Sequence, residues 1–162
     1  MRNAECLMRN EISTQVGEQL KQKNFTVATA ESCTGGLLAS TLTDVDGSSA
    51  YVTGGVVAYS NAIKISVLHV DAKTLQTFGA VSSQTAREMA SNVREIFSAS
   101  IGISTTGVAG SSVEGKPVGT VFVAVDADNF SDVREFHFAG SRTQIKAQAV
   151  DAALKLLTEC LT

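Results

Sequence analysis

The hydrophobic pattern of the chain changes period several times, and each change predicts a new element of secondary structure. Apolar residues every four positions in 10–21 indicate an amphipathic helix, whereas the short apolar run 25–30 (FTVATA) indicates a buried strand. Leucines on one face predict a helix over 34–43. A turn-rich segment, 44–55, then leads into a second apolar strand over 56–60 (VVAYS). The first part of the chain is therefore expected to alternate helix and strand.

Capping residues divide the middle of the chain into further helices. Asn61 opens a short helix, Asp71 caps another that stops at Gly79, and Ser82 caps a longer one with an apolar inner face. Residues 101–107 (IGISTTG) predict a third strand, which a polar loop follows.

Two segments near the end, 118–125 and 133–138, predict an antiparallel hairpin. Ser141 and Gln144, at the spacing of a capping box, start the final helix. Strands separated by helices and closed by a hairpin indicate an α/β sandwich on a mixed, mostly parallel sheet. Because no linker, internal repeat or low-complexity run interrupts the pattern, we expect residues 1–162 to form one domain.

The composition is that of a globular protein and argues against several kinds of partner. Of 162 residues, 44% are hydrophobic and 18% charged, and the formal net charge is −3. A negative chain without a basic face is not expected to bind nucleic acid or a membrane surface, although a local basic pocket for one small anion is allowed. The N-terminal segment has no apolar signal core, so we expect a cytoplasmic protein. The three cysteines lack metal-ligand spacing and are expected to be reduced thiols.

Candidate chemistry gathers in the loops that follow predicted strands, where open α/β sheets bind ligands. Three loops fit this description, around Ser32, Tyr59 and Gly107. Ser32 precedes the amides of Thr34, Gly35 and Gly36 at a predicted helix start, and such amides suit a phosphate or a developing oxyanion. The alternative is that Ser32 or Thr34 only caps the helix.

A serine nucleophile needs a base, and the chain offers few. The two histidines, His69 and His137, lie outside these loops, so a Ser-His-Asp triad is weakly supported. Lys64 could serve if burial lowered its pKa from about 10.4 to about 7–8; otherwise it is an exposed helix lysine. Cys33 competes as nucleophile, but its thiolate would depend on the helix terminus alone. The residues by themselves leave Ser32 and Cys33 both open.

Five segments occur in the order TAESCTGGLLASTLT, DGSSAYVTGGVVAYSNAIK, GAVS, TGVAG and KPVGTV. As a set they resemble the C-terminal domain of CinA, the competence-damage-inducible protein family, whose stand-alone members are nicotinamide-nucleotide amidohydrolases. The resemblance implies a three-layer α/β/α sandwich. It also implies pyridine nucleotide salvage, by hydrolysis of the carboxamide of nicotinamide mononucleotide to nicotinate mononucleotide and ammonia, with no metal and no cofactor.

Carried over by motif, the resemblance implies Ser32 as the nucleophile and Lys64 as its base, with Tyr59 beside them. Thr106 and Gly107 would line the site. The resemblance thereby favours the serine over the neighbouring cysteine.

A pyridine nucleotide carries a phosphate, and an acidic protein needs local donors to bind it. The candidates are Ser48, Ser49, Lys116 and Arg142. Arg142 is the strongest cation, because it stands at a helix start and arginine can grip a phosphate with two parallel hydrogen bonds. The alternative is an exposed arginine in the first turn of the helix.

The chain departs from the family pattern in one loop. Where the family reads close to AGPDGGxxxKPVGTV, residues 109–121 read AGSSVEGKPVGTV, which is shorter and lacks the proline and paired glycines. A non-catalytic, pyridine-nucleotide-binding or regulatory paralogue is therefore the alternative function, and an oligomerisation module without a ligand is a third. Apolar faces on several helices fit a homo-oligomer and equally fit the core of a sandwich.

Overall fold

A five-stranded sheet forms the centre of the computed structural model, which describes residues 2–162. Its strand order is β2-β1-β3-β4-β5. The strands are β1 (Val27–Glu31), β2 (Val52–Val57), β3 (Ile101–Gly107), β4 (Thr120–Ala127) and β5 (Phe130–His137). β2, β1 and β3 run parallel to one another, whereas β4 and β5 pair antiparallel as the predicted hairpin. The mixed sheet expected from the sequence is confirmed.

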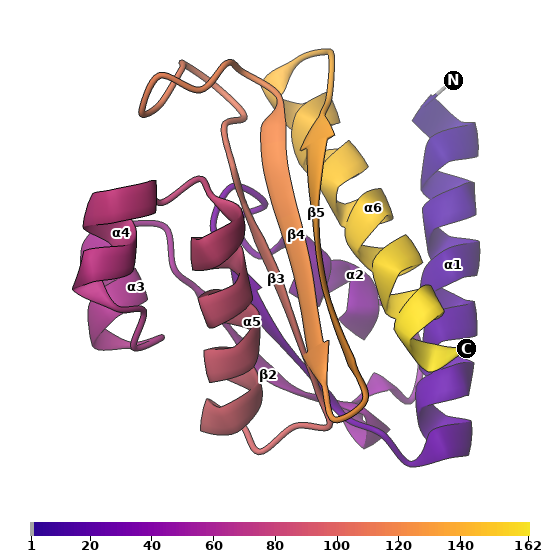
Figure 1. Cartoon of the computed structure of the whole chain (residues 1–162). Coiled ribbons are helices and arrows are strands. Elements are labelled where there is room, and N and C mark those ends of the chain that lie inside the picture. Colours follow the sequence, from indigo (N-terminus) through magenta and orange to yellow (C-terminus); the bar gives the residue numbers. More distant parts are fainter. Residues whose placement is uncertain (1) are drawn as a thin grey trace.

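Helices cover both faces of the sheet and complete a three-layer α/β/α sandwich (Figure 1). They are α1 (Arg2–Lys23), α2 (Leu37–Thr43), α3 (Asn61–Ser66), α4 (Ala72–Phe78), α5 (Ser83–Ile96) and α6 (Arg142–Leu161), with a short 3₁₀ helix, η1 (Ser48–Ala50). α2 and α6 lie against one face, and α1 packs outside them. α5 lies against the other face, with α3 and α4 on its outer side.

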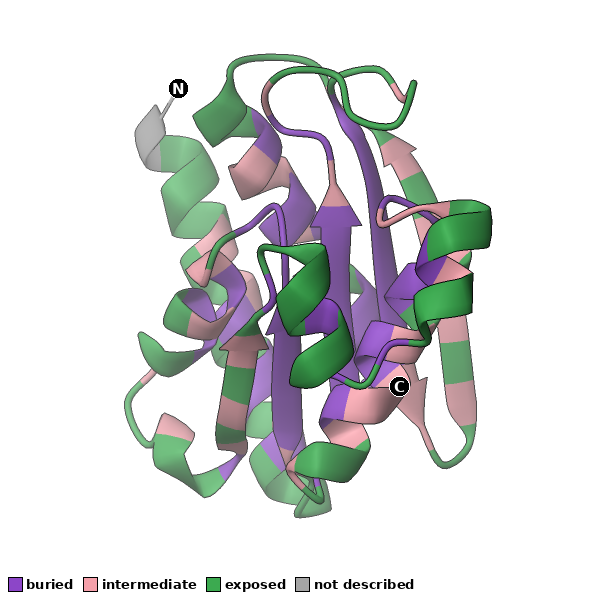
Figure 2. Cartoon of the chain, turned by 90° about the vertical axis from the view of Figure 1, so that its left-hand side faces the viewer, coloured by how far each residue is buried: buried purple, intermediate pink, exposed green. Residues whose placement is uncertain are grey.

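Two apolar layers hold the helices to the sheet. Alternate residues of β4 supply both: Val121, Val123 and Val125 join the cluster shared with α1, α2 and α6, whereas Phe122 and Ala124 join one shared with α5. Figure 2 shows the buried residues concentrated in the central strands. This well-packed centre gives the loops at the strand ends a fixed support.

β2 starts earlier than the sequence pattern predicted. The strand expected over 56–60 begins before the glycine pair, so Gly54 and Gly55 lie inside β2 rather than in a turn. Both glycines are in close contact with neighbours: a Cβ on Gly55 would overlap Thr29 Oγ1, and one on Gly54 would lie 2.5 Å from Phe97 Cε1. The glycines therefore serve close packing within a strand.

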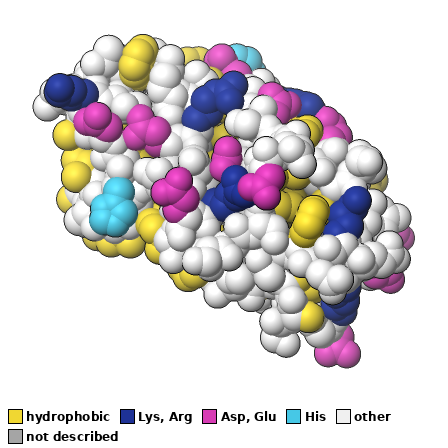
Figure 3. Space-filling view, turned by 60° about the horizontal axis from the view of Figure 1, so that its bottom comes forward, with side chains coloured by type: hydrophobic (Ala, Val, Ile, Leu, Met, Phe, Trp, Pro, Cys, Tyr) yellow, Lys and Arg dark blue, Asp and Glu magenta, His cyan; other side chains and the backbone are white. Residues whose placement is uncertain are grey.

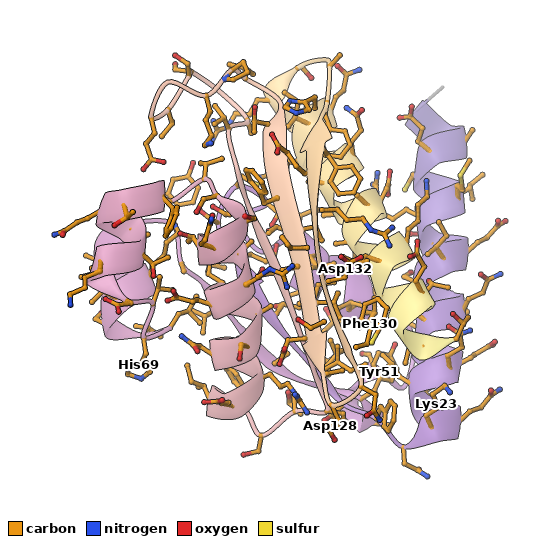
Figure 4. The ribbon with its side chains drawn as sticks, in the orientation of Figure 1. Lys23, Tyr51, His69, Asp128, Phe130 and Asp132 are labelled. Atoms are coloured by element: carbon orange, nitrogen blue, oxygen red, sulfur yellow. The ribbon has the colours of Figure 1, made fainter. Side chains whose placement is uncertain are left out.

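The surface at the lower end of the molecule, away from the carboxyl ends of the parallel strands, has no single dominant charge. Figure 3 shows basic and acidic side chains interspersed on this face. His69 projects from the segment between α3 and α4, and Tyr51 and Asp128 lie near the bottom of the sheet (Figure 4). Within residues 2–162, every helix is too short or too polar to cross a membrane.

Candidate active site

Ser32 lies where the connections of the sheet diverge. β1 continues into α2 on one face, whereas α5, which precedes the neighbouring strand β3, packs on the other. Such a switch point leaves a crevice outside the carboxyl ends of the strands, and ligands bind there in open α/β sheets. Ser32 follows β1 directly, and its amide donates a hydrogen bond to the Thr105 carbonyl oxygen at 2.9 Å. This bond fixes the serine against β3.

Lys64 reaches Ser32 from α3. Its Nζ lies 3.1 Å from Ser32 Oγ and donates a second hydrogen bond to the Ala58 carbonyl oxygen at 2.9 Å. The side chain of Ser60 caps α3 by accepting a hydrogen bond from the Ile63 amide. Lys64 is only 1% exposed, which is rare for a lysine. The structure thus brings together the serine and the lysine that the motifs had paired.

Burial affects Lys64 and Cys33 in opposite ways. It lowers the pKa of the Lys64 amino group by disfavouring the charged form, and the negative charge of Glu114 partly opposes this shift. A neutral amine at this distance can accept the proton of the serine hydroxyl. Burial raises the pKa of the Cys33 thiol to about 12, so the thiol stays protonated near neutral pH. The environment therefore favours Ser32 over Cys33 as nucleophile.

A buried carboxylate, Glu31, occupies the start of α2. The groups that donate hydrogen bonds to it are the Thr34 hydroxyl at 2.6 Å and the amides of Gly36, Leu38 and Ala39 at 3.1, 2.9 and 2.8 Å. Gly35 and Gly36 have positive φ values of 60° and 98°, so α2 begins at Leu37 and not at Thr34. Two of the three amides expected to face an anion are used within the protein, because Gly36 donates to Glu31 and Gly35 donates to the Ser32 carbonyl oxygen at 3.1 Å. The role of the Thr34 amide stays a prediction.

A pocket of about 360 Å³ opens beside Ser32. Its lining includes six residues that the sequence had proposed for the site: Ser32, Tyr59, Lys64, Thr106, Gly107 and Arg142. They come from the ends of β1, β2 and β3 and from the first turns of α3 and α6. The pocket therefore forms from the three strand-end loops that the sequence pattern had indicated.

The other six proposed residues lie outside the lining of this pocket: Thr34, Gly35 and Gly36 at the start of α2, and Ser48, Ser49 and Lys116. Ser48 and Ser49 lie in η1 and line a separate depression beside the end of α2. Lys116 places its Nζ 5.7 Å from the centre of the Phe122 ring. The sequence proposed the two serine hydroxyls and the Lys116 amine as donors to a phosphate. In the structure these side chains lie outside the pocket beside Ser32.

Arg142 and Tyr59 form a polar pair at the pocket. Arg142 Nη2 donates a hydrogen bond to Tyr59 Oη at 2.6 Å. Ser141 caps α6 together with Gln144 in the predicted capping box, so Arg142 is held in the first helical turn. Tyr59 is 61% exposed and accepts this hydrogen bond, so the pair lies at the rim of the pocket.

Glu114 is a pocket residue that the sequence analysis missed. It lies in the loop that departs from the family pattern, and its carboxylate accepts hydrogen bonds from the amides of Ala80 and Val81 at 3.0 and 3.3 Å. Thr106 ties the same turn to β3, because its hydroxyl donates to the Ala80 carbonyl oxygen at 2.7 Å. The only sequence signal for Glu114 was its place in a divergent loop.

Among the residues that the structure describes, no group of three or more acidic, histidine or cysteine side chains is arranged to hold a metal ion.

Comparison with known proteins gives one consistent family. The family model for the CinA C-terminal domain matches residues 9–161. A CinA-like protein of Chlorobium limicola is 48% identical over 148 residues, covering 86% of this chain and 34% of that protein. A CinA-like protein of Cytophaga hutchinsonii is 55% identical over 111 residues, covering 67% of this chain and 27% of that protein. The chain spans about a third of the length of the curated relatives it matches.

Solved structures agree closely with the fold. The competence damage-inducible protein A of Klebsiella pneumoniae superposes with a TM-score of 0.92 at 36% identity, over 94% of this chain and 96% of that chain. The competence/damage inducible protein CihA of Agrobacterium tumefaciens gives a TM-score of 0.92 at 38% identity, over 95% and 96%. From its fold, its motifs and the extent of these matches, the chain belongs to the CinA C-terminal domain family.

Proposed function

We propose that the pocket beside Ser32 hydrolyses the carboxamide of nicotinamide mononucleotide to nicotinate mononucleotide and ammonia, a step of pyridine nucleotide salvage. The observation that carries the proposal is the buried Lys64 Nζ, 3.1 Å from Ser32 Oγ. A serine activated by a neutral amine is suited to acyl transfer, and a carboxamide is an acyl group with ammonia as leaving group. The resemblance of the motifs to nicotinamide-nucleotide amidohydrolases supports the choice of this amide.

The two side chains account for every proton in the reaction. Ser32 Oγ attacks the carboxamide carbon while Lys64 Nζ takes the hydroxyl proton. The C–N bond of the tetrahedral intermediate then breaks, and Lys64 returns the proton to the leaving nitrogen, which departs as ammonia. Water attacks the resulting ester with Lys64 again as base, and the acid leaves as Ser32 regains its proton. No step is assigned to a metal or cofactor.

The rest of the pocket supports a phosphorylated substrate. The Arg142 guanidinium lies at the rim of the pocket, where it can donate hydrogen bonds to a phosphate. Its 2.6 Å hydrogen bond to the Tyr59 hydroxyl orients the guanidinium. The net charge of −3 repels anions at long range, so a local cation is needed for a nucleotide monophosphate.

The proposal predicts opposite outcomes for two adjacent residues. Ser32→Ala should lower turnover of nicotinamide mononucleotide by at least about a thousandfold, because it removes the nucleophile. Lys64→Ala should be similarly inactive, and the double variant little worse, since residues that act as one unit are not additive. Cys33→Ala is the matched control and should retain most activity. Release of ammonia and of the acid is the measurement.

Any of three results would contradict this proposal. Native protein could be folded and release no ammonia above the buffer background. Ser32→Ala could keep near-native turnover, or Cys33→Ala could be the one inactive variant.

One observation favours a second function. The divergent loop 111–116 brings the Glu114 carboxylate into the pocket, so the chain could bind a pyridine nucleotide in a regulatory role without hydrolysing it. Calorimetry separates the two functions: binding of nicotinamide mononucleotide by native protein, with no ammonia released over hours, would favour the non-catalytic role.

A further inference from the structure

We propose that Glu114 sets the charge specificity of the pocket by facing the cationic pyridinium ring of the substrate while Arg142 holds the phosphate. The inference rests on the proposed function, because it assigns a role in the same pocket. In nicotinamide mononucleotide the ring nitrogen is quaternary and positively charged, whereas the phosphate is negative. A pocket that carries one carboxylate and one guanidinium matches both charges at once.

The Glu114 carboxylate is held in place without being neutralised. Its two oxygens accept hydrogen bonds from the amides of Ala80 and Val81, at 3.0 and 3.3 Å. Among the ion pairs formed by the described residues, none involves Glu114. Each oxygen keeps a lone pair for a ligand, so the negative charge is positioned and still available.

The turn beneath the carboxylate leaves room for it. Gly79 has a φ of 85°, and a Cβ at this position would overlap Glu114 Oε2. Glu114 itself has a φ of 54°, in the left-handed region that few side chains other than those of asparagine and aspartate adopt readily. Both features bring the carboxylate of the 111–116 loop onto the turn before α5.

The guanidinium approaches the same pocket from the other side of the sheet. Arg142 begins α6, and α6 and α5 cover opposite faces (Figure 1). A Cβ on Gly110 would lie 2.5 Å from Arg142 Nη1, so this arginine sits over the start of the loop while Glu114 lies near its end. A zwitterion can therefore point its ring toward Glu114 and its phosphate toward Arg142, with the carboxamide near Ser32.

A purely structural role for Glu114 makes a different prediction. If the carboxylate only pins the loop, its removal should weaken all ligands of the pocket equally. If the carboxylate attracts the positive charge of the ring, its removal should weaken the binding only of ligands with a cationic ring.

Calorimetry on Ser32→Ala protein separates these roles, with two probes that differ in ring charge. The probes are nicotinamide mononucleotide and its reduced form, whose dihydropyridine ring is neutral while the carboxamide and phosphate are retained. We expect the cationic form to bind about fivefold more tightly, the range of a solvent-screened charge pair. Adding Glu114→Gln, which keeps an oxygen acceptor for the turn, should abolish this preference, because it weakens binding of the cationic form and leaves binding of the reduced form unchanged.

The matched control is Glu88→Gln. Glu88 also accepts a backbone hydrogen bond, from the Asp71 amide at 2.8 Å, but it lies outside the pocket lining. This control should keep the full preference for the cationic nucleotide.

Each outcome bears on the inference. A preference that survives Glu114→Gln, or an equal loss for both probes, would overturn it and leave the proposed function intact. A preference lost in Glu114→Gln supports it, even if native protein releases no ammonia, in which case the catalytic proposal alone fails. Binding of neither nucleotide would overturn both.

Discussion

Lys64 shows how far the chemistry of a residue depends on groups that are distant in sequence. Its local pattern allows either a base or an exposed helix lysine, and only the motif resemblance favoured the base. Its burial arises because α3 folds over Ser32, 32 positions earlier in the chain. Glu114 was missed for the same reason, since its hydrogen-bond partners lie more than 30 positions away in the α4–α5 turn. Local periodicity carries no information about such contacts.

Arg142 permits a test of substrate binding at a single residue. Arg142→Ala should raise the KM for nicotinamide mononucleotide about tenfold with little change in kcat, because a phosphate contact stabilises the ground state and the transition state alike. Tyr59→Phe, which removes the hydroxyl that accepts from the guanidinium, should give a smaller rise. Lys155→Ala, an exposed lysine on the same helix, is the control and should change neither constant. An unchanged KM for Arg142→Ala would remove this arginine from the site.

Among the elements, helix starts were predictable where the cap is local. Asp71, Ser82 and Ser141 cap α4, α5 and α6 as the sequence indicated, because each side chain accepts from an amide two or three residues later. α2 was predicted to start too early, because its cap is a glutamate from the preceding strand. The glycines of β2 were misassigned to a turn, since their close neighbours belong to β1 and to the end of α5.

Glu31 is expected to couple the stability of α2 to the position of Ser32. Glu31→Ala leaves the amides of Gly36, Leu38 and Ala39 without their acceptor, so it should lower the free energy of unfolding by about 3 kcal/mol. Glu31→Gln keeps one oxygen and should cost less. Glu159→Ala, which breaks an exposed ion pair with Arg134, is the control and should lower the free energy of unfolding much less. Urea unfolding measures all three, and a Glu31→Ala loss no larger than that of the control would contradict this role.

At the scale of the whole molecule, the layered arrangement followed from connectivity. Strands separated by helices require crossovers, which place helices on both faces, and a final hairpin adds the antiparallel edge. The packing of α1 outside α2 and α6 depends on matching of apolar surfaces and could not be read from its four-residue period. Assembly into a homo-oligomer stays a prediction, to be tested by light scattering.

The stability of the whole molecule should reveal the protonation of one buried lysine. Burial lowers the pKa of Lys64 in the folded state, whereas in the unfolded chain it titrates near about 10.4. Between these two values the unfolded state binds more protons than the folded state, so stability rises with pH. Below the folded-state pKa, the cost of burying the charge is fully present.

Comparison of native protein with Lys64→Met isolates this contribution, because other titrating groups cancel in the difference. The free energy of unfolding of the variant should exceed that of native protein most at pH values below the folded-state pKa of Lys64. This difference should shrink as the pH rises to about 10.4. The amidase activity of native protein should rise with pH over the start of the same window, because the neutral amine is the base. Urea unfolding at stepped pH gives the first quantity, and ammonia release gives the second. A stability difference between Lys64→Met and native protein that does not vary with pH would mean that Lys64 titrates as an ordinary lysine and cannot serve as the base.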